Sequence, residues 1–301
     1  MTEIQNIRSV VLIKQVPDTH NVTGDVMTKD GTMNRSALAA IFNPEDLNAL
    51  EMALAVREKH GGTVTVITMG PPKAAEILRD SLFRGADRAI LLTDRKFAAA
   101  DTLATSYTLK CAVEKSGPFD LVFCGRQAID GDTAQVGPQV AEKLSIPQIT
   151  YAESILELKN GSITAQRALE GGTEIVRCAL PCLITVVGSA NKPRPPSARR
   201  RIEYKLAATE LELPALLTRW PDFKTEAELK AFLSARGQII PVWTAADLGV
   251  EEEKIGLAGS PTQVHKINFV VLGSTASRDI APTREGIAAM IEELVQEYIV
   301  G

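Results

Sequence analysis

The first half of the chain alternates short apolar runs with longer amphipathic patterns, and this alternation limits the possible folds more than any other feature. The runs cover 9–16, 63–69, 88–93 and 120–124. Each is almost continuously apolar, which is typical of a strand covered on both faces in a parallel sheet. Parallel neighbours need long connections, and the helical patterns between the runs supply them. The expected fold class is α/β: an open, mainly parallel sheet with helices on both faces, of the Rossmann-like type.

Start and stop signals mark the helices between these runs. Asn43 is an N-cap candidate, Pro44 suits the first helical position, and Glu45 and Asp46 place acids in the first turn. Apolar residues then recur at helical spacing to His60, where two glycines stop the pattern. Further helices are expected over 70–85, 101–116 and 139–144.

The pattern changes beyond residue 148. Strands are expected over 149–156, 162–169, 174–179 and 183–187, and they extend or flank the sheet in a mixed or antiparallel manner. After Ser189 the density of proline and basic residues rises, and nothing there predicts a compact domain. Two helical patterns, 225–236 and 283–298, remain.

Composition excludes several classes of protein. With 45% hydrophobic and 23% charged residues, the chain is not mainly disordered, collagenous or coiled-coil. Its 33 basic and 37 acidic residues give a net charge of −4, which provides no reason to expect nucleic acid or a membrane surface as partner. The apolar stretch 178–191 is shorter than the roughly 18–20 residues of a membrane helix. Because the N-terminus lacks the features of a secretory signal, a cytoplasmic location is expected.

The sequence lacks the usual catalytic and metal-binding motifs. His20, His60 and His265 lie far apart, and neither a phosphate loop nor a G-x-G-x-x-G pattern occurs. The four cysteines form no C-x-x-C pair and are expected to be buried free thiols, and no metal site is expected. An ordinary enzyme is therefore disfavoured.

One segment, G-R-Q-A-I-D-G-D-T-A-Q-V-G-P over 125–138, stands out for its chemistry. It follows the fourth strand and leads into a helix, so it lies at the carboxyl edge of the sheet, where backbone amides suit a phosphate. Arg126 offers a counter-charge and Thr133 a hydroxyl. The residues 43–46 and 68–71, at other helix starts on this edge, could complete a nucleotide pocket. The alternative is a plain strand-to-helix turn.

Several motifs together resemble one family, the beta subunits of electron-transfer flavoproteins. They are V-L-I-K-Q-V-P-D at 11–18, N-P-E-D at 43–46, T-M-G-P-P at 68–72, R-G-A-D-R-A-I-L-L at 84–92, the segment 125–138, and A-Q-R-A-L-E-G-G-T-E-I-V-R-C-A-L-P-C-L-I-T at 165–185. The resemblance covers about 8–195. The long form D-G-D-T-A-Q-V-G-P resembles the members found in anaerobic bacteria.

The resemblance implies an αβ heterodimer that carries electrons and is not itself an enzyme. The alpha subunit holds most contacts to a redox-active FAD, and the beta subunit holds AMP. Alternatively, the same pocket takes the adenylate of a second FAD that oxidises NADH in electron-bifurcating members. Carried over position by position, the cofactor-binding residues are Leu12, Asn43, Pro44, Glu45, Asp46, Met69, Gly125, Arg126, Gln127, Ala128, Ile129, Asp130, Gly131, Asp132, Thr133, Ala134, Gln135 and Val136.

The resemblance also divides the chain into three parts: a nucleotide-binding domain over 1–190, a partner-recognition loop over 191–205 and an arm over 206–301 that wraps the alpha subunit. The loop departs from the family pattern, because Ala198 stands where many members place a leucine. From Lys192 to Lys205 it has six basic residues and one acid, which suits an acidic partner, although a solvated linker is the alternative. The partner-binding residues expected here are Lys192, Pro193, Arg194, Ala198, Arg199, Arg200 and Arg201.

Three functions remain possible at this stage. The first is an electron carrier that takes electrons from acyl-CoA dehydrogenases, as in fatty-acid β-oxidation, and passes them to a quinone oxidoreductase or similar acceptor. The second is a subunit of a bifurcating flavoprotein. The third, a stand-alone nucleotide-binding protein, is disfavoured by the long C-terminal segment.

Overall fold

The computed structural model describes residues 4–18, 39–262 and 279–297. The chain divides into two compact units, 1–264 and 265–301. Each unit is described separately. Residues 1–3 and 19–38 of the expected nucleotide-binding domain, and 263–278 and 298–301 of the expected arm, lie outside the described residues.

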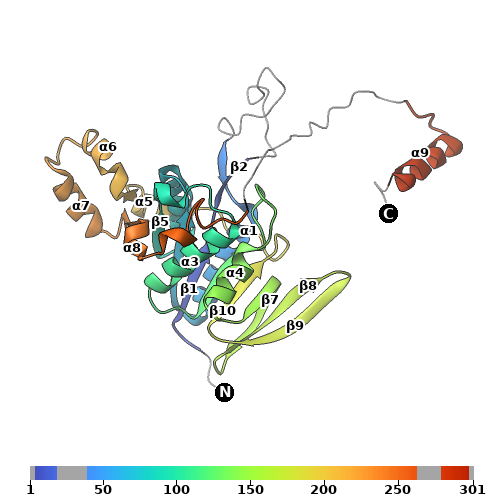
Figure 1. The fold of residues 1–301 in the computed structure, drawn as a ribbon, viewed down its shortest axis with the longest axis horizontal. Coiled ribbons are helices and arrows are strands. Elements are labelled where there is room, and N and C mark those ends of the chain that lie inside the picture. The colour runs from blue at the N-terminus through green and yellow to red at the C-terminus, as the bar shows by residue number, and fades with distance from the viewer. Residues whose placement is uncertain (1–3, 19–38, 263–278, 298–301) are drawn as a thin grey trace. The chain divides into compact units, whose positions relative to one another are not determined.

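A nine-stranded sheet runs through the described part of the first unit, in the order β13-β5-β4-β1-β6-β10-β7-β8-β9 (Figure 1). The central strands are parallel: β5 (Arg88–Leu92), β4 (Gly62–Met69), β1 (Ile7–Leu12), β6 (Leu121–Gly125) and β10 (Cys182–Val186). From β1 the chain builds outward through β4 to β5 and then crosses back to β6 on the other side of β1. The order therefore reverses between β1 and β6, which makes the sheet doubly wound.

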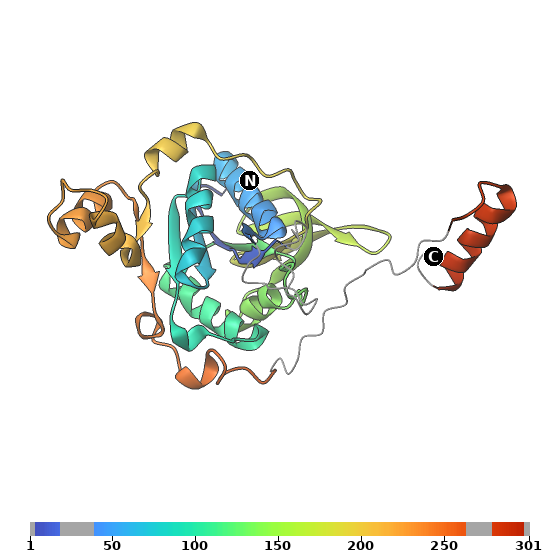
Figure 2. The ribbon, with the colours of Figure 1, turned by 90° about the horizontal axis from the view of Figure 1, so that it is seen from above.

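Helices cover both faces of this sheet. The helices α1 (Pro44–His60) and α2 (Ala75–Arg84) pack on one face, and α3 (Thr102–Lys115) and α4 (Val136–Lys143) pack on the other. Figure 2 shows α1 and the α3–α4 pair on opposite sides of the strands. Successive β1 residues join opposite cores: Val11 faces α1, and Val10 faces α3. The expected α/β class is confirmed.

An antiparallel extension continues the sheet beyond β10. The strands β7 (Gln148–Lys159), β8 (Ser162–Leu169) and β9 (Gly172–Ala179) follow as consecutive hairpins, and β7 joins β10 in parallel. The mixed arrangement expected for this region is confirmed.

The expected strand over 9–16 is split in two, so its prediction as one strand is wrong. β1 ends at Leu12, and β2 (Gln15–Pro17) pairs instead with β3 (Ala40–Phe42) in a separate two-stranded sheet. The physical reason lies at Lys14, whose N–H donates to Asp46 Oδ2 at 2.8 Å. Its carbonyl accepts the N–H of Asn43 at 3.0 Å, so α1 binds this residue in place of a neighbouring strand.

The first unit extends well beyond residue 190. The strand β13 (Val242–Trp243) pairs with β5 at the edge of the main sheet, and α5 (Ala198–Glu203) packs on α2. Residues of α6 (Leu213–Leu217) and α7 (Glu226–Ser234) form a small core of their own around Leu213, Leu229 and Leu233. The compact unit ends at 264 and not at the expected 190, because short apolar segments after 205 complete the sheet edge. The remaining short elements are β11 (Ala208–Thr209), β12 (Ile239–Ile240), α8 (Ala245–Leu248) and the 3₁₀ turns Pro72–Ala74, Arg95–Phe97, Glu210–Glu212 and Glu252–Lys254.

The second unit contains α9 (Arg284–Gln296), whose first turn is capped by the Thr283 hydroxyl. Ile287, Ile291 and Val295 recur every four residues and are 47%, 50% and 49% exposed. That α9 belongs to an arm around an alpha subunit stays a prediction. No helix among the described residues has the length and apolar character required to span a bilayer.

Candidate functional site

The site lies at the carboxyl edge of the sheet, where the strand order reverses between β1 and β6. In doubly wound sheets this is the place where a crevice forms, because the connections leave in opposite directions. Residues 13–14 follow β1, and 126–135 follow β6 and lead into α4. Asn43 and the first turn of α1 lie between these two segments, and the hydrogen bonds described next join them to both.

Three side chains at the start of α1 hold the segment after β6. The N–H groups of alternate residues donate to them: Gly125 to Asp46 Oδ1 at 2.9 Å, Gln127 to Glu45 Oε2 at 3.0 Å, and Ile129 to Asn43 Oδ1 at 3.2 Å. The Asn43 amide also donates to the carbonyl of Gln127 at 2.9 Å. We call Asn43, Glu45 and Asp46 the clasp. Its side chains therefore shape the site by fixing the backbone of 125–129.

Asp46 is the most buried acid of the clasp, with 6% of its surface exposed. Its second oxygen accepts the Lys14 N–H, so one carboxylate joins the ends of β1 and β6. Burial raises the pKa of Asp46 to about 7, against the lowering effect of the hydrogen bonds from Gly125 and Lys14. Burial also raises the pKa of the neighbouring Cys124 thiol, and the charges of Asp46 and Glu45 add to that effect.

The two cations at the edge are already paired with acids. Lys14 Nζ lies 2.7 Å from Asp130 Oδ2, and an Arg126 guanidinium nitrogen lies 3.0 Å from Glu45 Oε1. The Arg126 guanidinium also lies 5.8 Å from the ring centre of Tyr151. Arg126, expected as a counter-charge for phosphate, is thus partly neutralised within the protein.

The N–H groups after the clasp belong to exposed or half-buried residues over 133–136, whereas Gly137 is buried. None of the N–H groups of 133–137, at the N-terminus of α4, donates a hydrogen bond to another described residue. Asp132 and Ala134 adopt φ values of 49° and 52°, so the backbone turns sharply before the helix. The open amides of a helix N-terminus attract anions, so this segment retains the chemistry that a phosphate requires.

Two glycines of the segment play different roles. A Cβ on Gly131 would meet no atom within 4 Å, so the space outside Gly131 is open. A Cβ on Gly137 would lie 2.7 Å from Cys124 Sγ and 2.9 Å from Thr185 Cγ2. Gly137 therefore allows α4 to lie close against β6 and β10.

The remaining expected site residues also reach this edge. Leu12 is 5% exposed and packs in the core under α3 and α4, and Met69 packs against the same core at the end of β4. Sequence reasoning did not name Lys14, Tyr151 or Gly137 as site residues, although Lys14 lies within the motif 11–18 and Gly137 within the segment 125–138. Lys14 could have been found as the one charged residue inside the apolar run 9–16, and Gly137 by its place beside a proline at a helix start.

The expected partner-recognition loop is fastened to α1 and α2. Arg194 Nε donates to Glu51 Oε2 at 2.8 Å, and the same guanidinium pairs with Glu58. Arg200 Nε donates to the carbonyl of Leu82 at 3.1 Å. Lys192, Ala198, Arg199 and Arg201 remain exposed, and Pro193 is half-buried. The structure thus separates two anchoring arginines from the residues that face solvent.

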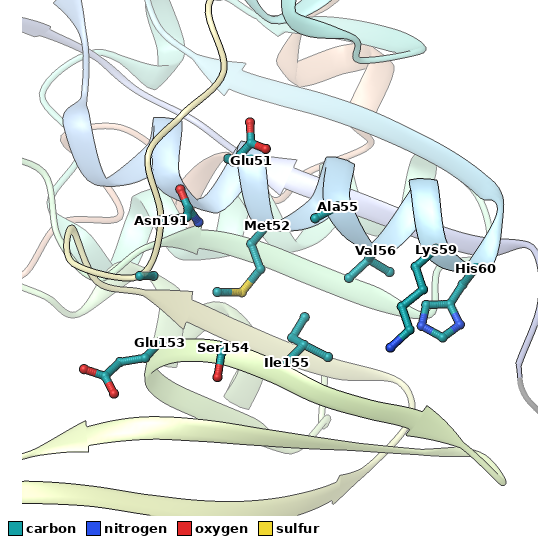
Figure 3. A pocket seen from close by; sticks show the side chains of 11 residues that line it. Glu51, Met52, Ala55, Val56, Lys59, His60, Glu153, Ser154, Ile155 and Asn191 are labelled. Atoms are coloured by element: carbon teal, nitrogen blue, oxygen red, sulfur yellow. The ribbon is translucent and has the colours of Figure 1, made fainter.

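A separate cavity of about 250 Å³ lies between α1 and β7. Met52 extends from α1 toward Ser154 and Ile155, with Lys59 and His60 at the far end of the helix (Figure 3). Two of its polar groups are already engaged, Glu51 by Arg194 and Asn191 by Asn48. This cavity is distinct from the clasp.

No disulfide joins the four cysteines. Cys124 and Cys182 are buried as expected, whereas Cys111 and Cys178 are half-buried. Among the described residues, no group of three or more His, Cys, Asp or Glu side chains is placed to hold a metal ion.

The doubly wound sheet and the loop at its switch point define an open α/β subunit of Rossmann-like class. Residues 30–211 match the electron transfer flavoprotein domain. The electron transfer flavoprotein subunit beta of Thermoanaerobacterium thermosaccharolyticum is 41% identical over 97% of this chain and 99% of its own length. The corresponding subunit of Clostridium acetobutylicum is 39% identical over the same shares. The caffeyl-CoA reductase-Etf complex subunit CarD of Acetobacterium woodii is 42% identical over 86% of this chain and 87% of its own length.

The chain belongs to the electron transfer flavoprotein family, among its beta subunits. An electron-transfer role and an alpha-subunit partner follow from that membership. The resemblance expected from the motifs is confirmed.

Proposed function

We propose that this chain forms a heterodimer with its alpha subunit and carries electrons from an acyl-CoA dehydrogenase to a quinone oxidoreductase or similar acceptor. The observation that carries the proposal is the similarity to beta subunits over nearly the whole chain. Names of relatives support the class of partner. One is a subunit of a caffeyl-CoA reductase complex, and another, from Anaerotignum propionicum and 37% identical, is an acryloyl-CoA reductase electron transfer subunit gamma.

In this proposal the carboxyl edge binds an adenine nucleotide, AMP in the first instance. The fit rests on the open N–H groups of 133–137 and on the unfilled space at Gly131. The clasp fixes the backbone that precedes these amides, so they are held in place before a phosphate arrives. The proposed nucleotide-binding residues remain those of 43–46 and 125–136 together with Leu12 and Met69.

The FAD shared with the alpha subunit would supply the redox chemistry of the complex. This chain's part is to bind the alpha subunit and to orient the surfaces between which electrons pass. The apolar stripe of α9 fits the alpha-subunit contact, because three large side chains there are about half exposed. We propose a cytoplasmic location for the complex.

A second candidate is a bifurcating flavoprotein in which a second FAD occupies the same pocket and takes electrons from NADH. The long form of 130–138 resembles the members found in anaerobic bacteria, some of which hold a second FAD, but it does not separate AMP from FAD. Both nucleotides present an adenylate to the same residues.

Counting nucleotides separates these functions. The chain is co-expressed with its alpha subunit, the complex is denatured, and the released FAD and AMP are quantified against protein. One FAD and one AMP per heterodimer support the carrier, and two FAD support bifurcation. Absence of any adenine nucleotide beyond the shared FAD would contradict the proposed pocket.

A further inference from the structure

The carboxylate of Asp46 joins the two strand ends that border the proposed nucleotide pocket. It accepts the Lys14 N–H at 2.8 Å after β1 and the Gly125 N–H at 2.9 Å at the end of β6. These are the two strands between which the sheet reverses. Since each oxygen is engaged by the protein's own backbone and the residue is 6% exposed, Asp46 is poorly placed to contact a ligand.

We propose that Asp46 is a positioning residue that acts only in its ionised form, clamping the ends of β1 and β6 so that the pocket can accept an adenine nucleotide. This inference rests on the proposed nucleotide-binding function and adds a dependence on protonation. It changes the expected role of Asp46 from contact to clamp.

The steric fit around Gly125 shows how closely the Asp46 carboxylate approaches the end of β6. A Cβ on Gly125 would lie 2.6 Å from Asp46 Oδ1 and 2.8 Å from the carbonyl carbon of Glu45. Any side chain at this position would push β6 away from α1. Because Gly125 has no side chain, β6 and α1 come close enough for the Gly125 N–H to reach the Asp46 carboxylate.

Most of the charged groups around Asp46 form ion pairs with other residues. The Lys14 ammonium pairs with Asp130, and Glu45 pairs with Arg126. The buried Cys124 thiol on β6 stays neutral, because burial and the two nearby acids raise its pKa. The Asp46 charge is therefore held mainly by backbone N–H groups and by Asn43, and burial places its pKa at about 7.

Protonation removes an acceptor that the clamp needs. A carboxylate offers two equivalent acceptor oxygens, whereas a carboxylic acid has one carbonyl oxygen and one hydroxyl that prefers to donate. One of the two strand ends then faces an O–H in place of an acceptor. The segment 125–129 would keep its bonds to Glu45 and Asn43 and the bond from the Arg126 N–H to the Val186 carbonyl, but the end of β6 would lose its link to Lys14.

The first test is AMP binding across pH. The full chain in complex with its alpha subunit is depleted of AMP and titrated with AMP between pH 5.5 and 8.5. The wild-type affinity should fall by about tenfold per pH unit below a midpoint near 7, as binding that requires an ionised group does. D46N should bind weakly and keep only the dependence that comes from the phosphate of AMP itself, whose second pKa is about 6. D222N, an exposed carboxylate between α6 and α7, should keep the wild-type profile.

The second test needs no nucleotide. Hydrogen–deuterium exchange of peptides covering 12–15 and 121–129, corrected for intrinsic rates, should accelerate in the wild-type complex as pH falls through 7. This change is local: the protonated carboxyl stays buried but loses one of its two backbone contacts. Exchange should be fast at every pH in D46N. If D46N does not fold, the wild-type exchange and affinity profiles still decide the matter.

Wild-type affinity or exchange without a transition near pH 7 would overturn the inference. If AMP fails to bind at any pH while exchange shows the transition, the proposed nucleotide function fails and the clamp stands.

Discussion

Arg194 Nε lies 2.8 Å from Glu51 Oε2, which fastens the basic segment after β10 to the side of α1. The two glutamates Glu51 and Glu58 also raise the pKa of Arg194. The segment expected to be a free docking loop is thus partly a structural strap. This distinction decides which of its arginines can meet a partner.

Replacing Arg194 with alanine should lower the free energy of unfolding by about 1 kcal/mol, a modest value because the Arg194 side chain is 28% exposed. Urea denaturation of the purified complex measures it. Lys192→Ala, on an exposed neighbour, should leave stability unchanged. Equal effects of the two variants would contradict the anchoring role.

Reversing Arg199 and Arg201 together to glutamate should slow electron transfer from the dehydrogenase partner at low salt, with the difference shrinking as salt rises. Arg199 and Arg201 are both exposed, although the Arg201 guanidinium lies 5.7 Å from the ring centre of Phe83, whereas Arg200 holds the carbonyl of Leu82 and is left intact. Stopped-flow rates at several ionic strengths provide the measurement. Unchanged rates would support a solvated linker.

Gly131→Val should reduce AMP affinity on the order of tenfold, equivalent to about 1.4 kcal/mol, because its side chain would fill open space beside the amides of 133–137. The matched control is Gly172→Val, since a Cβ there also meets nothing within 4 Å. Isothermal titration with AMP compares the two complexes. Retention of full affinity in Gly131→Val would remove this segment from the pocket.

Asp46 should make stability and nucleotide affinity change in opposite directions with pH. Its folded pKa of about 7 is above the ordinary 3.8, so its contribution to stability is complete below pH 3.8 and is lost as pH rises through 7. The free energy of unfolding should change by at most about 1.4 kcal/mol per pH unit in that window. Denaturant titrations of wild type and Asp46→Asn test this. The variant should lack that component of the slope, and identical slopes would contradict it.

Ile287→Asp combined with Ile291→Asp should weaken assembly with the alpha subunit by tenfold or more, since a buried isoleucine contributes about 1.5–3 kcal/mol. Both side chains lie on the exposed apolar stripe of α9. Size-exclusion chromatography at decreasing concentration reports the dissociation. The pair Glu285→Gln and Glu292→Gln changes exposed residues of the same helix and should assemble normally.

The isolated full chain should aggregate and lack FAD, because that stripe would remain uncovered. Light scattering and absorbance of the chain expressed alone provide the measurement. A monodisperse monomer that binds FAD by itself would overturn the heterodimer.

Local sequence determined most of the elements. Continuous apolar runs predicted β4, β5 and β6 within a residue or two, and Asn43 followed by Pro44 located the start of α1. These signals act between neighbouring residues, so they are readable without the fold. The segment 125–138 could be assigned to the carboxyl edge for the same reason, because the loop that follows a parallel strand begins at that edge.

Only the tertiary structure decided what the site residues do. Asn43, Glu45 and Asp46 carry chemistry suited to a ligand, but the fold places alternate N–H groups of 125–129 against them, so they hold the loop. Arg194 and Arg200 look identical to Arg199 in sequence, yet two of the three anchor the chain. Their roles depend on contacts between residues more than a hundred positions apart, such as Arg194 with Glu51, and such pairings follow from strand order and helix packing, which no local pattern encodes.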